Sequence, residues 1–164
     1  MKRQLKKIVC LALITSMILG QKTLKTTKNV TAKEKKDIKI AIDAGHQARG
    51  NFAMEPVGPG SSTRKAKVAG GATGVASHVP EYKLTLAVSK KLQKELKARG
   101  YKVYMIRTKN NVNISNKKRA QLANKSGADI YIRIHADSSN SRAVTGASGL
   151  YPSKANRYVS KLSA

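Results

Sequence analysis

Cysteine is almost absent from this sequence. Cys10 is the only one among 164 residues, and it lies inside an apolar N-terminal run. The folded region therefore has neither a disulfide framework nor a Cys-x-x-Cys metal or redox motif. We expect its stability to come from a packed core and a bound metal ion.

Other common motifs are missing as well. The sequence contains no phosphate-binding Gly-Lys-Ser loop and no Gly-x-Ser-x-Gly turn. Their absence excludes the usual nucleotide-binding and serine-hydrolase classes. No internal repeat is present, so the sequence offers no repeated wall-binding module.

Acidic residues are scarce. Eight Asp and Glu stand against 33 Lys and Arg, which gives a formal net charge of +25. Such a charge favours anionic partners: nucleic acid, membrane surfaces or acidic polymers. Tyr and Phe are few and do not alternate with basic residues, so no base-stacking surface is indicated. We expect anionic cell-wall polymers, not nucleic acid, as partners; a merely solvated basic surface is the alternative.

The N-terminal segment has the pattern of a secretory signal peptide. A basic start, Met1–Lys7, precedes an apolar run, Ile8–Leu19, and a polar exit. The run is shorter than the roughly 20 residues of a membrane-spanning helix. We expect residues 1–21 to direct export to the cell wall, as a cleaved signal or an uncleaved membrane anchor; a buried apolar helix is the alternative. The Lys/Thr-rich residues 22–37 predict a solvated linker.

Apolar strand-like runs alternate with amphipathic segments in residues 38–164, which we take as the folded domain. Strands are expected at 38–42, 103–106 and 128–134, and helices at 81–99 and 115–124. This alternation predicts an α/β fold, a mainly parallel twisted sheet with flanking helices.

The first expected helix carries an apolar stripe that should face the sheet. The stripe consists of Leu84, Val88, Leu92 and Leu96. Pro80 suits the start of this helix and Gly100 its end. Ser115 suits the N-cap of the second helix, and Gly127 its end.

The remaining segments have weaker patterns. Residues 47–80 are rich in Gly, Pro and Ser, and they predict a long loop of the kind that lines a substrate site. We expect a weak strand at 149–151 and a short helical tail at 154–162.

Two of the strands end on a histidine. His46 follows the first strand and His135 the third, while Glu81 opens the first helix. In a parallel sheet such positions share one edge, where ligands bind. Two imidazoles and a carboxylate form the three-ligand set of a catalytic zinc site. Each residue also has a simpler explanation, since exposed strand-end histidines are common and an acid in the first turn stabilises the helix dipole.

Further candidates lie near these three. Asp43 and Asp137 could orient a ligand histidine or cap local backbone. Arg107 and Arg119 could bind a substrate anion or pair with the few acids. Asn124 is a candidate that could equally be a helix C-cap, and the third histidine, His78, is interpreted as an exposed loop residue.

Three segments together resemble the zinc-dependent N-acetylmuramoyl-L-alanine amidases of bacterial cell-wall turnover. They are IAIDAGHQ, VPEYKLTLAVSKKLQKELKARGYKVYMIRT and NISNKKRAQLANKSGADIYIRIHAD, which keep the family's order between about Lys39 and Leu150. The loop EPVGPGSSTRKAKVAGGATGVAS is similar to the long loop of one branch of the family. The resemblance implies that His46, Glu81 and His135 are zinc ligands, and that Arg119 and Asn124 are mainly structural.

The resemblance also implies the reaction and a missing part. The family hydrolyses the amide between N-acetylmuramic acid and the L-alanine of the stem peptide, using zinc and a glutamate base on a late strand. No glutamate follows His135 here, so no catalytic base is assigned and we expect it beyond the C-terminus. The family's last strands and closing helix are likewise expected beyond Leu162. We therefore expect weak zinc binding and slow turnover from these residues alone.

Two other functions stay open at this point. One is a non-catalytic wall-binding remnant of the family that keeps the metal site without the base. The other is a basic protein that acts through charge alone, on membranes or nucleic acid.

Overall fold

The described part of the chain consists of residues 33–139, 141 and 143–151 in this computed structural model. Its elements are η1 (Lys35–Asp37), β1 (Lys39–Ala44), β2 (Asn51–Pro56), β3 (Arg64–Val68), α2 (Glu81–Ala98), β4 (Lys102–Met105), α3 (Asn116–Lys125) and β5 (Ile130–Ile134). They belong to one compact unit that begins at Lys35.

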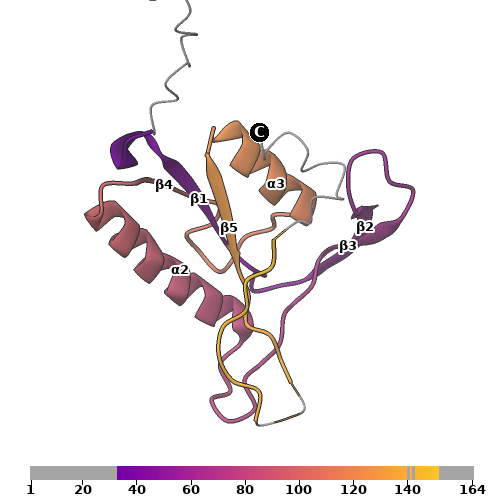
Figure 1. Cartoon of the computed structure of the whole chain (residues 1–164). Coiled ribbons are helices and arrows are strands. Elements are labelled where there is room, and N and C mark those ends of the chain that lie inside the picture. The colour runs from indigo at the N-terminus through magenta and orange to yellow at the C-terminus, as the bar shows by residue number, and fades with distance from the viewer. Residues whose placement is uncertain (1–32, 140, 142, 152–164) are drawn as a thin grey trace, which may run out of the picture. The chain divides into compact units, whose positions relative to one another are not determined.

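A three-stranded parallel sheet forms the centre of this unit. Its strand order is β4-β1-β5, and Figure 1 shows α2 and α3 on either side of β1. The side chains of Ile40 to Ala44 are all buried, as expected for a parallel strand covered on both faces. The predicted α/β class and mainly parallel sheet are confirmed.

Helix α2 has the ends that the sequence predicted. Pro80 is its N-cap residue, with φ −64° and ψ 141°, and Arg99 is its C-cap. Gly100 follows with φ +90°, a conformation that glycine adopts without steric strain. The predicted helix, residues 81–99, therefore agrees with the observed helix, Glu81–Ala98, to within one residue.

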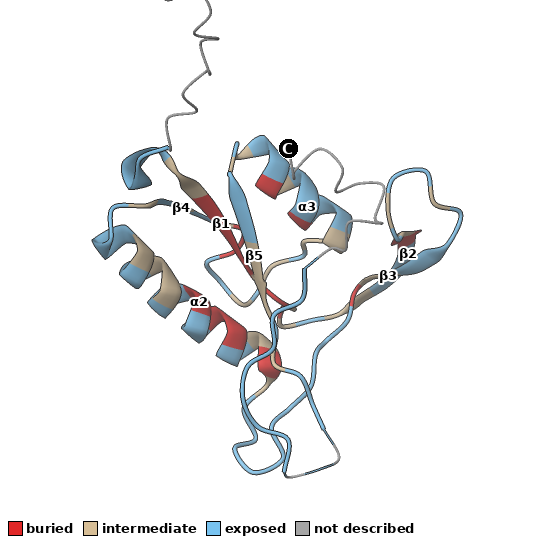
Figure 2. Cartoon of the chain, viewed as in Figure 1, coloured by how far each residue is buried: buried red, intermediate tan, exposed pale blue. Residues whose placement is uncertain are grey.

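The buried face of α2 differs from the predicted stripe. Leu84 and Val88 are 44% and 41% exposed, whereas Thr85 and Ser89 are fully buried against the sheet (Figure 2). The hydroxyl of Thr85 donates a hydrogen bond of 2.8 Å to the carbonyl of Gly45. The predicted face is wrong for Leu84 and Val88, whereas Leu92 and Leu96 are half-buried as part of the same stripe. The contact of Thr85 with the end of β1 puts polar side chains on the buried face.

Helix α3 begins at a side-chain cap. The Ser115 hydroxyl accepts a hydrogen bond from the backbone N–H of Lys118, which confirms the predicted N-cap. Ala123 packs with Ala41 and Ile106 in a small apolar cluster on one face of the sheet.

Residues 47–80 contain a β-hairpin where the sequence predicted only loop. Strands β2 and β3 pair antiparallel, with a register irregularity between Asn51 and Met54. Only Glu55 and Val68 are buried in these strands, so no apolar alternation marks them. The Glu55 carboxylate accepts a hydrogen bond of 2.9 Å from the backbone of Lys117, which joins the hairpin to the first turn of α3.

The expected strand at Gly149–Tyr151 is absent, since these residues are exposed and form no ladder. The expected tail at 154–162, the expected signal segment at 1–21 and most of the expected linker lie outside the described residues. Within the described ranges, no helix combines the length and apolar character needed to cross a bilayer.

The burial of Ile42 in the core of the sheet leads to a prediction about stability. We expect Ile42→Ala to lower the free energy of unfolding by roughly 2–5 kcal/mol, because Ile42 is fully buried in β1. Leu84→Ala should cost only about 1 kcal/mol, since this side chain is 44% exposed. Urea denaturation followed by circular dichroism measures both, and equal losses would contradict the described face of α2.

Candidate metal centre

Three side chains from separate elements converge at the carboxyl edge of the sheet. His46 follows β1, His135 follows the neighbouring strand β5, and Glu81 is the first residue of α2. One donor atom from each lies within 4.8 Å of the others. Glu81 Oε2 is 3.3 Å from His46 Nε2, and Glu81 Oε1 is 3.0 Å from His135 Nδ1. The structure thus brings together all three residues that the sequence predicted as ligands.

The His46 ring is oriented by a backbone carbonyl. Its Nδ1 atom lies 2.9 Å from the carbonyl oxygen of Ala69, which can only accept a hydrogen bond. Nδ1 therefore donates this hydrogen bond, and Nε2 is the ring nitrogen nearest to Glu81. A carbonyl that fixes the tautomer in this way is a usual partner of a metal-binding histidine.

The carboxylate of Glu81 is buried but well supplied with donors. Burial raises its pKa, yet hydrogen bonds from the backbone N–H groups of Ala136 and Ala72 and the contacts with His135 and His46 outweigh this effect. The pKa of Glu81 therefore lies below its ordinary value, and the side chain is ionised at neutral pH. An anionic oxygen is thus available between the two imidazoles.

Two glycines allow the three side chains to approach. A Cβ atom on Gly71, whose φ is +84°, would lie 2.9 Å from His46 Cγ and 3.0 Å from Glu81 Oε2. A Cβ atom on Gly45 would lie 2.6 Å from His135 Cε1. The shortest of these distances, 2.9 Å at Gly71 and 2.6 Å at Gly45, are closer than a Cβ atom tolerates. Alanine at either position would therefore displace a candidate ligand.

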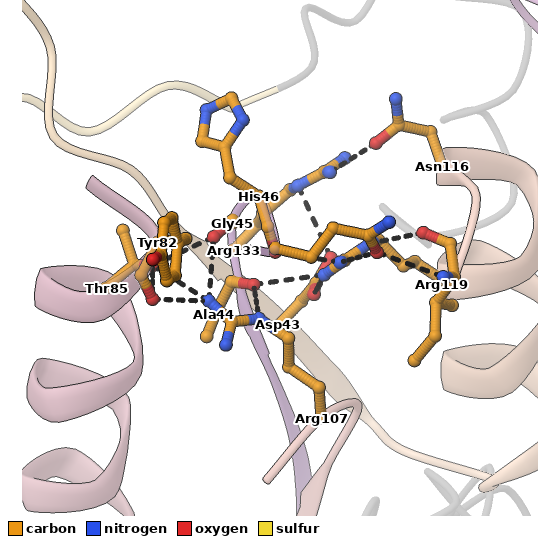
Figure 3. Close-up of polar contacts among 12 residues, drawn as sticks. Asp43, Ala44, Gly45, His46, Tyr82, Thr85, Arg107, Asn116, Arg119 and Arg133 are labelled. Carbon is orange, nitrogen blue, oxygen red and sulfur yellow. Dashed lines mark hydrogen bonds and ion pairs between the residues drawn. The ribbon is translucent and has the colours of Figure 1, made fainter. Parts of the chain in front are cut away.

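A buried guanidinium group holds the chain around His46. Arg119 Nη1 donates to the carboxylate of Asp43 at 2.6 Å and to the carbonyl of Ala44 at 3.0 Å. Its Nη2 donates to the carbonyl of His46 at 2.9 Å and to Gln47 Oε1 at 3.2 Å. Figure 3 shows the His46 ring directed away from this network while its backbone takes part in it.

A second guanidinium group binds the other side of the same turn. Arg107 donates to the carbonyls of Ala44 and Gly45, at 2.8 and 3.0 Å, and to the carbonyl of Tyr82 in the first turn of α2 at 2.8 Å. Burial lowers its pKa to about 10, so it remains charged at neutral pH. Arg107 thereby links the β1 end to the helix that carries Glu81.

Asp43 is the anionic centre of these contacts. Besides Arg119, its carboxylate accepts a hydrogen bond of 2.6 Å from the Tyr131 hydroxyl and pairs with Arg133 at 3.3 Å. Burial and the nearby Asp43 charge raise the pKa of Tyr131, so its hydroxyl stays a donor. Asp43 forms no hydrogen bond with the ring of His46 or His135, so its predicted contact with a candidate ligand is not observed.

The remaining sequence candidates lie outside the three-residue group. Asn124 is exposed, and only its carbonyl takes part in the α3 end, where Ser126 is the C-cap. Asp137 is exposed, and no hydrogen bond joins it to His46 or His135 within the described chain. His78 is an exposed loop residue, as the sequence predicted.

Sequence patterns missed several contributors to the site. The Ala69 carbonyl, Gly71 and the backbone role of Arg107 all depend on how loops return to the sheet edge. The adjacent glycines 70 and 71 were the only signal for that close approach.

The donor set fits a divalent metal ion. Two ring nitrogens and one carboxylate oxygen match the borderline preference of zinc, and three protein ligands leave a position for water or substrate. The fixed tautomer of His46, the ionised Glu81 and the close approach at Gly71 support this fit.

Comparisons with known proteins identify related sequences and folds. Residues 40–164 match the family model described as N-acetylmuramoyl-L-alanine amidase. The solved amidase Ami1 of Mycobacterium smegmatis has a TM-score of 0.59 at 22% identity, covering 65% of this chain and 50% of that one. The apo form of Ami1 from Mycobacterium abscessus has a TM-score of 0.57 at 24% identity, covering 62% and 49%. At these identities the likeness shows the fold alone, and this chain spans about half the length of either structure. No curated protein sequence matches the chain.

The buried ion pair predicts a large loss of stability. Arg119→Ala leaves the Asp43 carboxylate buried with one cation fewer, and we expect a loss of roughly 3–5 kcal/mol. The exposed pair of Arg99 and Glu95 is the matched control, and Arg99→Ala should cost about 0.5 kcal/mol or less. Thermal or urea unfolding compares the two variants, and a loss as small for Arg119→Ala as for Arg99→Ala would refute the network.

The two adjacent glycines predict a local effect on metal affinity. Gly71→Ala should weaken zinc binding about 10–100-fold, because its Cβ would displace His46 or Glu81. Gly70→Ala is the control, since a Cβ at that position meets nothing within 4 Å. Competition titration with a chromophoric zinc chelator measures both affinities. Equal affinities for the two variants would show that the close approach does not shape the site.

Proposed function

Because the chain belongs to the N-acetylmuramoyl-L-alanine amidase family, we propose that it hydrolyses the amide bond between N-acetylmuramic acid and L-alanine in peptidoglycan. The observation that carries this proposal is the group of His46, Glu81 and His135, whose donor atoms lie within 4.8 Å of one another. Two imidazoles and a carboxylate with an open position are the donor set of hydrolytic zinc enzymes.

We assign zinc as the cofactor from the donor set. When bound, zinc would polarise the scissile carbonyl and make water more acidic. His46 would contribute Nε2, because its Nδ1 donates to Ala69, and Glu81 would contribute an ionised oxygen. His135 would contribute a ring nitrogen, and the arginines beneath β1 would keep the His46 backbone in place.

Amide hydrolysis also needs a group that takes a proton from water and passes it to the leaving amine. Within the described residues, the group contains no carboxylate besides Glu81, which is engaged with both histidines. A positioned base contributes about 10²–10⁴-fold to such reactions. We therefore propose that turnover at this group of described residues is slow.

The same observation favours a second candidate. A chain with the metal ligands and without a positioned base would bind peptidoglycan in a zinc-dependent way and release no product. Co-sedimentation with peptidoglycan, combined with an assay for new amino groups, separates this candidate from a slow amidase.

We also propose that the protein acts outside the cytoplasm, at the cell wall. The basic and apolar pattern of residues 1–21 supports export, and the net charge of +25 favours contact with anionic wall polymers. A fusion of residues 1–21 to a reporter enzyme that is active only after export tests this location.

The amidase proposal predicts zinc-dependent release of amino groups from purified peptidoglycan. The 164-residue chain should bind one zinc ion and release L-alanine amino groups slowly, and His46→Ala should abolish both. His78→Ala is the matched control, because His78 is an exposed loop histidine outside the group. Zinc content by mass spectrometry and amino-group labelling give the two measurements. Release that survives His46→Ala or chelation, or that is equally lost in His78→Ala, would contradict the proposal.

A further inference from the structure

A pocket of about 500 Å³ lies between two chain segments of the described part of the structure. Its lining residues belong to the segments 47–52, after β1, and 111–113, before α3. This volume falls in the range of small-ligand sites. The first lining residue, Gln47, directly follows His46 in the sequence, and none of the three candidate ligands lines the pocket.

The walls of the pocket are fixed by internal hydrogen bonds. Asn51 Nδ2 donates to Asn113 Oδ1 at 3.0 Å, which joins the two segments, and the Asn51 oxygen accepts from the N–H of Ala53. The Gln47 amide is buried, with its oxygen bound by the N–H of Ile114 and its nitrogen donating to the carbonyl of Arg49. The Gln47 amide and the Asn51–Asn113 hydrogen bond support the pocket, and Asn113 Nδ2 takes no part in that bond.

An aromatic ring forms the open side of the pocket. Phe52, the only phenylalanine of the chain, is 74% exposed. Its ring lies over Gly50, where a Cβ would come within 3.0 Å of Phe52 Cζ. An exposed ring held over a glycine offers a flat apolar surface to a ligand.

Polar groups with unused hydrogen-bonding capacity line the same pocket. Among the described residues, the Asn111 amide, Asn113 Nδ2 and the Arg49 guanidinium donate no hydrogen bond to another residue. Neutral amides can both donate and accept, whereas the lining contains one cation and no carboxylate. This composition suits a neutral ligand rich in hydroxyl and acetamido groups that also has an apolar face.

We propose that this pocket is a subsite for an N-acetylated sugar of the glycan strand, with Phe52 stacked on the sugar ring and Asn111 and Asn113 bonded to its polar substituents. The inference rests on the proposed amidase function and names the part of the substrate that this pocket holds. A stem peptide carries several carboxylates, and the pocket offers only Arg49 to bind them. The sugar is therefore the better match.

The sequence contains no tryptophan, so Phe52→Trp introduces a single fluorescent reporter into the pocket. The 164-residue chain with this substitution is titrated with peptidoglycan glycan strands stripped of their peptides, with free stem peptide and with dextran. We expect a saturable change in tryptophan emission with the stripped glycan and none with the other two. A response to the stem peptide instead, or no response to stripped glycan, overturns the assignment.

Truncation of the pocket supplies the second measurement. Phe52→Ala and Asn111→Ala should each weaken co-sedimentation with an insoluble stripped glycan, by about tenfold for Phe52→Ala. Met54→Ala is the matched control, because Met54 is a half-exposed residue of the same strand outside the pocket lining. Glycan binding that is unaffected by Phe52→Ala, or equally affected by Met54→Ala, overturns the subsite.

These assays use no cleavable amide, so the two proposals fail separately. If glycan binding depends on Phe52 but intact peptidoglycan releases no amino groups in a zinc-dependent way, the subsite is supported and the amidase proposal is refuted. Zinc-dependent release that is insensitive to Phe52→Ala, together with no glycan binding, removes the subsite alone.

Discussion

Two buried guanidinium groups hold the backbone from which His46 projects. Arg107 and Arg119 together take the carbonyls of residues 44–46, and Arg119 is buried there beside the carboxylate of Asp43. A buried ion pair is a weak source of net stability, because desolvation of both charges offsets their attraction. Its value here is geometric, because the carbonyls at the end of β1 receive charged donors that fix the direction of the chain. His46 projects from this turn, and the lining of the pocket begins at the next residue, Gln47.

The central fold could be predicted because its signals are local. The β-branched run of β1 and the capping residues of α3 each act within a few positions along the chain. The face of α2 could not be predicted in the same way, because Thr85 is buried through a contact 40 residues away, with Gly45. The hairpin was missed since its strands carry exposed side chains, and a tertiary contact through Glu55 holds it to α3.

The three candidate ligands could be predicted from the sequence, whereas most of the contacts that hold them in place could not. Parallel neighbours β1 and β5 place His46 and His135 on one edge, so strand ends alone predicted their convergence, and the start of α2 added Glu81. Their role as metal ligands stays a prediction. For Arg119 the sequence left open a substrate anion or a pair with one of the few acids. The structure shows the pair with Asp43 and adds backbone carbonyls that are known only from the folded chain.

The backbone of His46 has φ +59°, in the left-handed region that glycine adopts freely and that costs other residues about 1 kcal/mol or more. The chain therefore places its candidate ligand at a position where glycine would be the more stable choice. A substitution to glycine would remove the backbone strain and stabilise the fold, but it would also remove the imidazole that the candidate metal centre needs. Selection of variants for folding alone would favour glycine at this position. Selection for zinc binding would favour histidine despite its strained backbone.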